Sequence, residues 1–246
     1  MSFPLSKEKV FGLSLYQPAR GYRYSLDAFL LASFVRLKRG QRALELGAGC
    51  GVVTLILAEK NSETSFLGLE IQRELILCFK RNVRENALSA RVLPVLGDVR
   101  RPPLKEGAFE VVYANPPYYR EGAGRLSPDP QERLARHEIL ATLKDFVEAA
   151  YRALKARGRF FLVCTAKRLS EALFLLEGRR LSPKRLCLVH SYPGDEARLF
   201  LLEAVKEGGA ELRVEAPLFI YEKKGGPYTP KLREILGLSQ ASSGRG

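Results

Sequence analysis

The tetrapeptide Asn115-Pro116-Pro117-Tyr118 has the residue types needed to hold a planar amino group. Asn115 offers a side-chain carbonyl as an acceptor, and Pro116 offers a backbone carbonyl on a rigid corner that lacks N–H groups. Tyr118 offers a ring on which a flat substrate can stack. These groups suit the exocyclic amine of a nucleobase or the amide of a glutamine. A tight turn after the apolar run 109–114 is the alternative, which Pro-Pro alone would favour.

A second motif at residues 45–51 reads Glu-Leu-Gly-Ala-Gly-Cys-Gly, with glycines at alternate positions between an apolar run and a helix-forming stretch. Glycine allows a tight bend and lets a ligand lie against the backbone. The G-x-G-x-G spacing differs from the G-x-G-x-x-G of dinucleotide-binding loops, which argues against NAD. Preceded by Glu45, the motif resembles the loop that holds the amino-acid end of S-adenosylmethionine.

Two acidic residues follow the next two apolar runs. Glu70 ends the run 65–70 and can accept hydrogen bonds from both hydroxyls of a ribose. Asp98 follows the run 91–96 and can take the amine of an adenine. An acid at such a position is often only a helix cap. Because Glu70, Asp98 and Asn115 all follow expected strands, we expect them to face one crevice.

The segments that must position these residues alternate between apolar runs and stretches of helical period. This alternation predicts an α/β, Rossmann-like fold with a seven-stranded, mostly parallel sheet and helices on both faces. The connection 191–197 is too short for a crossover helix, so it predicts an antiparallel edge hairpin. Strands are expected at 42–46, 65–70, 91–96, 109–114, 159–165, 186–191 and 197–205, and helices at 50–60, 71–86, 139–155 and 167–178.

We expect a core at residues 41–210 flanked by smaller segments. Residues 1–40 form an N-terminal head that packs on the cofactor pocket and has a helix at 26–37. Residues 211–238 add a strand and helix extension, and the small, polar tail 239–246 is expected to be disordered.

Composition excludes several function classes. The 246 residues contain no apolar run long enough to span a bilayer and no signal-peptide pattern, so we expect a soluble, cytoplasmic protein. The four cysteines are widely spaced, which indicates reduced core thiols. With only two histidines and no clustered cysteines, we expect no metal.

The net charge of +13 favours a polyanionic partner. The cations cluster: segments 36–42, 152–168 and 179–185 contain Lys and Arg but no acidic residue. Such clusters can neutralise the phosphates of a nucleic acid, although they can also be the solvated faces of helices. Since acidic residues do not keep pace, we favour a nucleic acid.

Together these motifs resemble the amino-methylating class I methyltransferases, which act on adenine or guanine of nucleic acids or on glutamine of release factors. Three further segments resemble the bacterial tRNA1(Val) adenine-37 N6-methyltransferase family: 17–32, 133–139 with its Ala-Arg-His-Glu core, and 217–229. The resemblance spans nearly the whole chain. Release-factor enzymes have a helical N-terminal domain that forty residues cannot supply, which counts against that branch.

The resemblance implies S-adenosyl-L-methionine as cofactor and an RNA as substrate, with tRNA as the expected RNA. It implies that Glu45, Gly47, Gly49 and Gly51 shape the methionine end, Glu70 the ribose end and Asp98 the adenine end of the pocket, with Asn115 beside them. Tyr24, Ser25 and Asp27 would close the pocket from the head. Asn115, Pro116 and Tyr118 would be catalytic, with Tyr118 also stacking on the base. Arg120 and Arg125 flank a Gly-rich loop; they are substrate contacts or solvated charges. His137 would be structural.

The function expected on these grounds is methyl transfer to the N6 amine of an adenine in RNA, at adenine-37 of a tRNA anticodon loop. A ribosomal-RNA guanine-N2 or adenine-N6 methyltransferase is the alternative. A protein glutamine methyltransferase and a non-catalytic, S-adenosylmethionine-binding RNA-binding protein also remain open.

Overall fold

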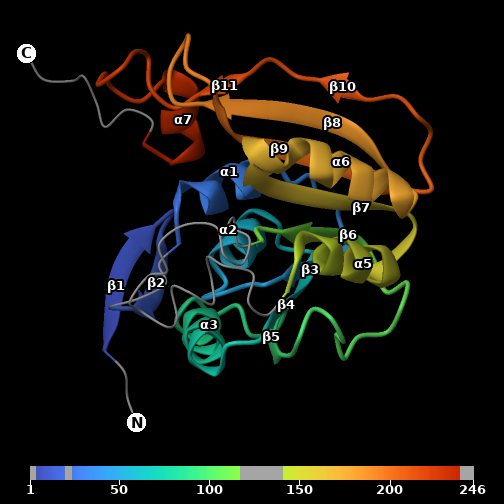
Figure 1. The fold of residues 1–246 in the computed structure, drawn as a ribbon. Coiled ribbons are helices and arrows are strands. Elements are labelled where there is room, and N and C mark those ends of the chain that lie inside the picture. Colours follow the sequence, from blue (N-terminus) through green and yellow to red (C-terminus); the bar gives the residue numbers. More distant parts are fainter. Residues whose placement is uncertain (1–3, 20–23, 117–140, 239–246) are drawn as a thin grey trace, which may run out of the picture.

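A single large sheet forms the centre of the protein, whose computed structural model describes residues 4–19, 24–116 and 141–238 (Figure 1). The strand order is β10-β8-β9-β7-β6-β3-β4-β5, and β11 also pairs with β8. Strand β9 is antiparallel to β7 and β8, and the other pairs are parallel. The strands are β3 (Arg42–Leu46), β4 (Ser65–Glu70), β5 (Val92–Leu96), β6 (Phe109–Ala114), β7 (Leu154–Thr165), β8 (Leu181–His190), β9 (Ala197–Lys206), β10 (Arg213–Val214) and β11 (Leu218–Phe219).

This arrangement confirms the expected α/β class, and two short strands extend the sheet beyond the β8–β9 hairpin. Helices cover both faces because side chains alternate along each strand. Ala43, Val111 and Phe161 belong to one hydrophobic cluster, and Leu44, Val112 and Phe160 to the other. The first cluster contains residues of α1 (Leu26–Phe34), α2 (Val52–Lys60), α3 (Arg73–Glu85) and α7 (Pro230–Ile235), and the second contains residues of α5 (Leu143–Ala153) and α6 (Leu169–Gly178).

Helix α5 ends earlier than the sequence predicted. A capping box starts it: the hydroxyl of Thr142 accepts from the Asp145 N–H, and the Asp145 carboxylate accepts from the Thr142 N–H. It ends at Ala153, two residues before the expected end at 155. Leu154 instead begins β7 and pairs with Phe109 of β6. Pairing with the sheet therefore overrides local helix propensity there.

The head contains a hairpin that the sequence did not predict. Strands β1 (Leu5–Val10) and β2 (Leu13–Pro18) are antiparallel and lie beside α3 (Figure 1). Phe11 and Gly12 join them, both with left-handed backbones (φ 52° and 80°), the pattern of a two-residue hairpin turn that matches strand twist. Such turns usually have Asn or Gly at their first position. Phe11 does not match this pattern, so the sequence did not indicate a hairpin.

The ring of Phe11 reaches the C-terminal part of the chain. The ammonium group of Lys60 lies 4.8 Å from the ring centroid. A Cβ placed on Gly237, just after α7, would lie 2.7 Å from a ring carbon. Gly237 also has a left-handed backbone (φ 69°). Glycine is therefore required where the hairpin turn and the C-terminal helix meet.

A candidate active site at the carboxyl ends of the parallel strands

A pocket lies where β3 and β6 end. It is lined by Tyr24, Ala28, Glu45, Gly47, Ala48, Cys50, Val52, Val53 and Asn115. Asn115 directly follows the last residue of β6, and Glu45 and Gly47 flank the last residue of β3. The structure therefore brings the glycine motif and the first residue of the tetrapeptide to one pocket, whose lining includes neither Glu70 nor Asp98. Pro116 follows Asn115 and is buried.

The glycine loop has a backbone that side chains would obstruct. Gly47, Gly49 and Gly51 have φ values of 70°, 55° and 81°, in the left-handed region that favours glycine. A Cβ on Gly51 would lie 2.0 Å from a ring carbon of Phe79. Gly51 is the N-cap residue of α2, so this close contact packs α3 against the start of α2. The loop is thus shaped by packing as well as by conformation.

Glu45 is buried, with 2% exposure, and lines the pocket. Its Oε2 accepts hydrogen bonds from the backbone N–H of Thr54 (3.1 Å) and from the Thr54 hydroxyl (2.5 Å). The Thr54 hydroxyl also lies 2.6 Å from the Tyr113 hydroxyl. Burial, opposed by the Thr54 hydrogen bonds, raises the pKa of Glu45 to about 8.

Glu70 ties the glycine loop to the neighbouring helix. Its Oε2 accepts from the Gly49 N–H and its Oε1 from the Gln72 N–H, each at 2.8 Å. Burial raises the pKa of Glu70, against these backbone hydrogen bonds, which lower it. Each carboxylate oxygen keeps a second lone pair. Glu70 can therefore hold the loop and accept a further hydrogen bond; contact with a ribose stays a prediction.

Asp98 lies two residues beyond β5 and is paired with a residue that the sequence analysis did not consider. The guanidinium of Arg100 donates to Oδ2 at 2.6 Å and 2.9 Å. This contact lowers the pKa of Asp98. The acid is held as an anion, and the proposed adenine contact must use a lone pair that Arg100 leaves.

The three head residues lie at the start of α1. Tyr24 lines the pocket, and its hydroxyl donates to Glu8 Oε2 of β1. The Ser25 hydroxyl donates to Asp27 Oδ2 at 2.9 Å, and Asp27 is buried. Tyr24 is thus beside Glu45 and Asn115. Tyr118, Arg120, Arg125, the loop between those arginines, His137 and the tail 239–246 lie outside the described residues.

Two asparagines of α3 join the head to the glycine loop, and sequence reasoning missed both. Asn82 is fully buried; its Oδ1 accepts from the Tyr16 N–H (2.6 Å), and its Nδ2 donates to the carbonyls of Tyr16 (2.9 Å) and Cys50 (3.0 Å). Asn86, one turn later, bonds the N–H and carbonyl of Ser14 in the same way. An Asn within the apolar stripe of a helix was the available signal.

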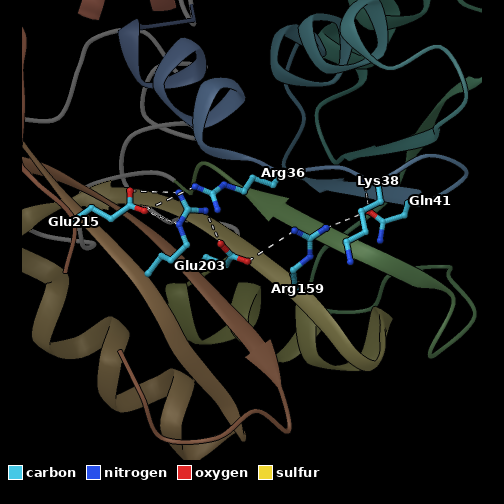
Figure 2. A network of polar contacts seen from close by, with 7 residues as sticks. Arg36, Lys38, Gln41, Arg159, Glu203 and Glu215 are labelled. Carbon is cyan, nitrogen blue, oxygen red and sulfur yellow. Dashed lines mark hydrogen bonds and ion pairs between the residues drawn. The ribbon is translucent and has the colours of Figure 1, made fainter. Parts of the chain in front are cut away.

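The basic sequence clusters are largely paired with glutamates. Arg185 contacts Glu203 at 2.6 Å and Glu215 at 2.8 Å, and Arg159 and Arg36 extend this network (Figure 2). Further ion pairs join Arg42 and Lys155 to Glu110, Arg152 and Arg179 to Glu148, Arg168 to Glu171, and Arg39 to Glu63. Several of these residues lie at the starts of β3, β7 and β8, the edge opposite Asn115. Clustering in sequence therefore overstates the free positive charge.

A basic hollow of about 220 Å³ lies between the segment after β5 and the end of α5. Its charged lining residues are Arg100, Arg101, Lys105, Glu106 and Arg152. Among the described residues, Arg101 and Lys105 have no ion-pair partner, whereas Arg100 and Arg152 are paired. These two side chains are available to an anion.

In the described part of the chain, no helix is long and apolar enough to span a membrane. The same residues contain no group of three or more His, Cys, Asp or Glu side chains placed to hold a metal ion.

Comparison with known proteins gives consistent matches. The family model of the methyltransferase small domain matches residues 26–178. A curated Dyadobacter fermentans protein named tRNA1(Val) (adenine(37)-N6)-methyltransferase is 28% identical over 213 residues, 85% of this chain and 87% of that protein. A Bacteroides fragilis protein of the same name is 25% identical over 196 residues, 79% of this chain and 81% of that protein.

Solved structures share the fold. A predicted O-methyltransferase from Agrobacterium tumefaciens aligns with a TM-score of 0.71 and 25% identity, over 88% of this chain and 98% of that one. A SAM-dependent methyltransferase from Aquifex aeolicus aligns with a TM-score of 0.54 and 15% identity, over 73% of this chain and 89% of that one.

Proposed function

The chain belongs to the methyltransferase small domain family, and from this membership we propose that it transfers a methyl group from S-adenosylmethionine to the N6 amine of an adenine in RNA. The proposed nucleotide is adenine-37 of a tRNA anticodon loop, and the proposed site of action is the cytoplasm. The observation that carries the proposal is the position of Asn115, which lines the same pocket as the glycine loop.

The residues of the pocket fit S-adenosylmethionine. When bound, this cofactor supplies an electrophilic methyl group on a sulfonium. Its amino-acid end carries an ammonium group, which suits the buried carboxyl of Glu45. The left-handed backbone at Gly47 and Gly49 presents a side-chain-free surface to it. Glu70, at the end of the adjacent strand, retains acceptor capacity for ribose hydroxyls.

The tetrapeptide orients the nucleophile under this proposal. The side-chain carbonyl of Asn115 and the backbone carbonyl of Pro116 accept the two protons of the adenine amine. This grip draws the nitrogen lone pair out of conjugation with the ring and stabilises the positive charge that develops on N6. Tyr118 stacks on the base. Because a base in a loop is unpaired, flipping it out of the RNA costs little free energy. The released proton passes to water.

Support for tRNA comes from the relatives, because proteins named for tRNA1(Val) adenine-37 align over most of the chain. A ribosomal-RNA guanine-N2 or adenine-N6 enzyme would use the same amine clamp and is the second candidate. Glutamine methylation and a non-catalytic RNA-binding role rank lower, since the chain retains the intact tetrapeptide and resembles RNA-modifying relatives.

A labelling experiment tests the proposal. The protein is incubated with radiolabelled S-adenosylmethionine and either total tRNA or ribosomal RNA from cells lacking the modification, and the digested nucleosides are separated. We expect label in N6-methyladenosine from tRNA only. A tRNA transcript with guanosine at position 37 is the matched control and should take no label. Label in ribosomal RNA would select the second candidate, and label in protein would refute RNA methylation.

A further inference from the structure

A hydrogen-bond chain links the glycine loop to the strand that carries Asn115. Glu45 and Tyr113 are partners in the register of β3 and β6, so their side chains leave the same face of the sheet. Thr54, in the first turn of α2, lies between them and bonds both. Thr54 and Tyr113 are fully buried.

When Glu45 is ionised, the donor and the acceptor of each hydrogen bond between Tyr113, Thr54 and Glu45 are fixed. A carboxylate only accepts, so the single proton of the Thr54 hydroxyl must be donated to Glu45 Oε2. The Tyr113 hydroxyl then donates to the Thr54 oxygen. Together with the Thr54 N–H at the start of α2, these donors favour the ionised acid at this position.

The groups that face Glu45 supply no positive charge. Among the described residues, the pocket lining contains no Lys, Arg or His, and no cation forms an ion pair with Glu45. Titratable groups on the surrounding elements are Glu70 of β4, Tyr113 of β6, Cys50 of the loop, Asp27 of α1 and Tyr24 before it. Burial and Glu70 together raise the pKa of Glu45 to about 8. Because Glu45 is buried and faces no cation, we expect it to carry a proton in the free protein near neutral pH.

We propose that Thr54 and Tyr113 are positioning residues that hold Glu45 for the ammonium group of the cofactor, and that cofactor binding expels one proton from Glu45. This inference rests on the proposed S-adenosylmethionine-dependent function. The balance is simple: the O–H bond of the Glu45 carboxyl breaks, the carboxylate pairs with the ammonium, and the proton passes to solvent. The Thr54 hydroxyl and N–H stabilise the new anion, and the Tyr113 hydroxyl orients the Thr54 hydroxyl.

Calorimetry with S-adenosylhomocysteine tests whether ligand binding releases a proton. This ligand keeps the ammonium group and the nucleoside of the cofactor. Titrations of the full chain at pH 7 in buffers of different ionisation enthalpy should show release of close to one proton. Because the free protein must lose that proton, affinity should fall about tenfold per pH unit from pH 7 to pH 6, where the α-amine of the ligand stays charged. An acid with an ordinary pKa would release no proton and give constant affinity over this range.

The double variant Thr54→Val/Tyr113→Phe tests the two positioning residues. It removes both hydroxyls together, so neither is left buried without a partner, and it preserves most of the volume. We expect affinity at pH 7 to fall roughly 10- to 100-fold, as for lost hydrogen bonds to a charged group. The decline of affinity with acid should also begin at higher pH. Thr54→Ser retains the hydroxyl and should bind like wild type. Tyr151→Phe, on α5, is the matched control and should change neither quantity.

The outcomes separate the two proposals. Proton release by wild type but not by Glu45→Gln, with weaker and pH-shifted binding in the double variant, supports the inference. Binding without proton release, or a folded double variant with wild-type affinity and pH profile, overturns it. Thermal unfolding of each variant confirms the fold. Failure of wild type to bind S-adenosylhomocysteine at any pH would instead refute the proposed function and its premise.

Discussion

At the scale of single residues, Glu45, Glu70 and Asn115 could be placed from sequence because the carboxyl ends of neighbouring parallel strands share one edge. Thr54 and Tyr113 could not be singled out. A threonine in a helix and a tyrosine in a strand are common, and only the folded position of α2 over β6 brings their hydroxyls to 2.6 Å. Arg100 was missed because an acid followed by arginines reads as a solvated loop.

The amine clamp gives a prediction at this scale. Asn115→Ala removes one acceptor that is preorganised for the charge developing on N6, and we expect single-turnover methylation of tRNA to fall roughly 100- to 1000-fold. Affinity for S-adenosylhomocysteine should stay within about twofold, because the glycine loop and Glu45 are unchanged. Asn61→Ala, at the far end of α2, is the control and should keep wild-type turnover. Lost cofactor binding in Asn115→Ala would show a structural role.

At the scale of elements, the strands of the core were predicted within a few residues at most ends because each is an apolar run between turn residues. The β1–β2 hairpin was not, since its turn begins with Phe11. Its attachment depends on Asn82, a single side chain that bonds the hairpin and the glycine loop at once. Helix α3 is therefore the element through which the head and the pocket are joined.

Loss of the Asn82 hydrogen bonds should strongly reduce the free energy of unfolding. Asn82→Ala leaves the N–H and carbonyl of Tyr16 and the carbonyl of Cys50 unsatisfied in a buried site, so we expect unfolding free energy to fall by at least about 3 kcal/mol in urea. Affinity for S-adenosylhomocysteine should fall too. Asn86→Ala removes a similar clamp at a partly exposed position where water can replace it, and should cost about 1 kcal/mol without changing affinity. Equal effects of both variants would contradict this assignment.

At the scale of the whole molecule, the sequence gives the net charge of +13, but it does not indicate which cations are paired with glutamates in the fold. Glutamates from distant segments fold onto the arginine clusters, as Glu203 and Glu215 do around Arg185. Pairing of this kind depends on strand order, which a list of charges does not contain. Arg101 and Lys105, in the basic hollow, are among the described cations that have no ion-pair partner.

Salt dependence of RNA binding can locate the footprint. If Arg101 and Lys105 each neutralise a phosphate, the double variant Arg101→Glu/Lys105→Glu should weaken tRNA binding and reduce the slope of log affinity against log salt by roughly 1.4 to 1.8. Arg180→Glu is the control, because Arg180 pairs with Glu207 and lies just before β8. Fluorescence anisotropy over a salt series gives both slopes. A changed slope in the control alone would place the RNA-binding surface beside the start of β8 instead of at the hollow.

The contact between Phe11 and Gly237 has a consequence for the order of folding during synthesis. A ribosome makes the chain from its N-terminus, so the hairpin at residues 5–18 leaves the exit tunnel early. The residue against which its turn rests is made near the end. The hairpin can therefore dock on α3 through Asn82 while its turn still lacks this last neighbour.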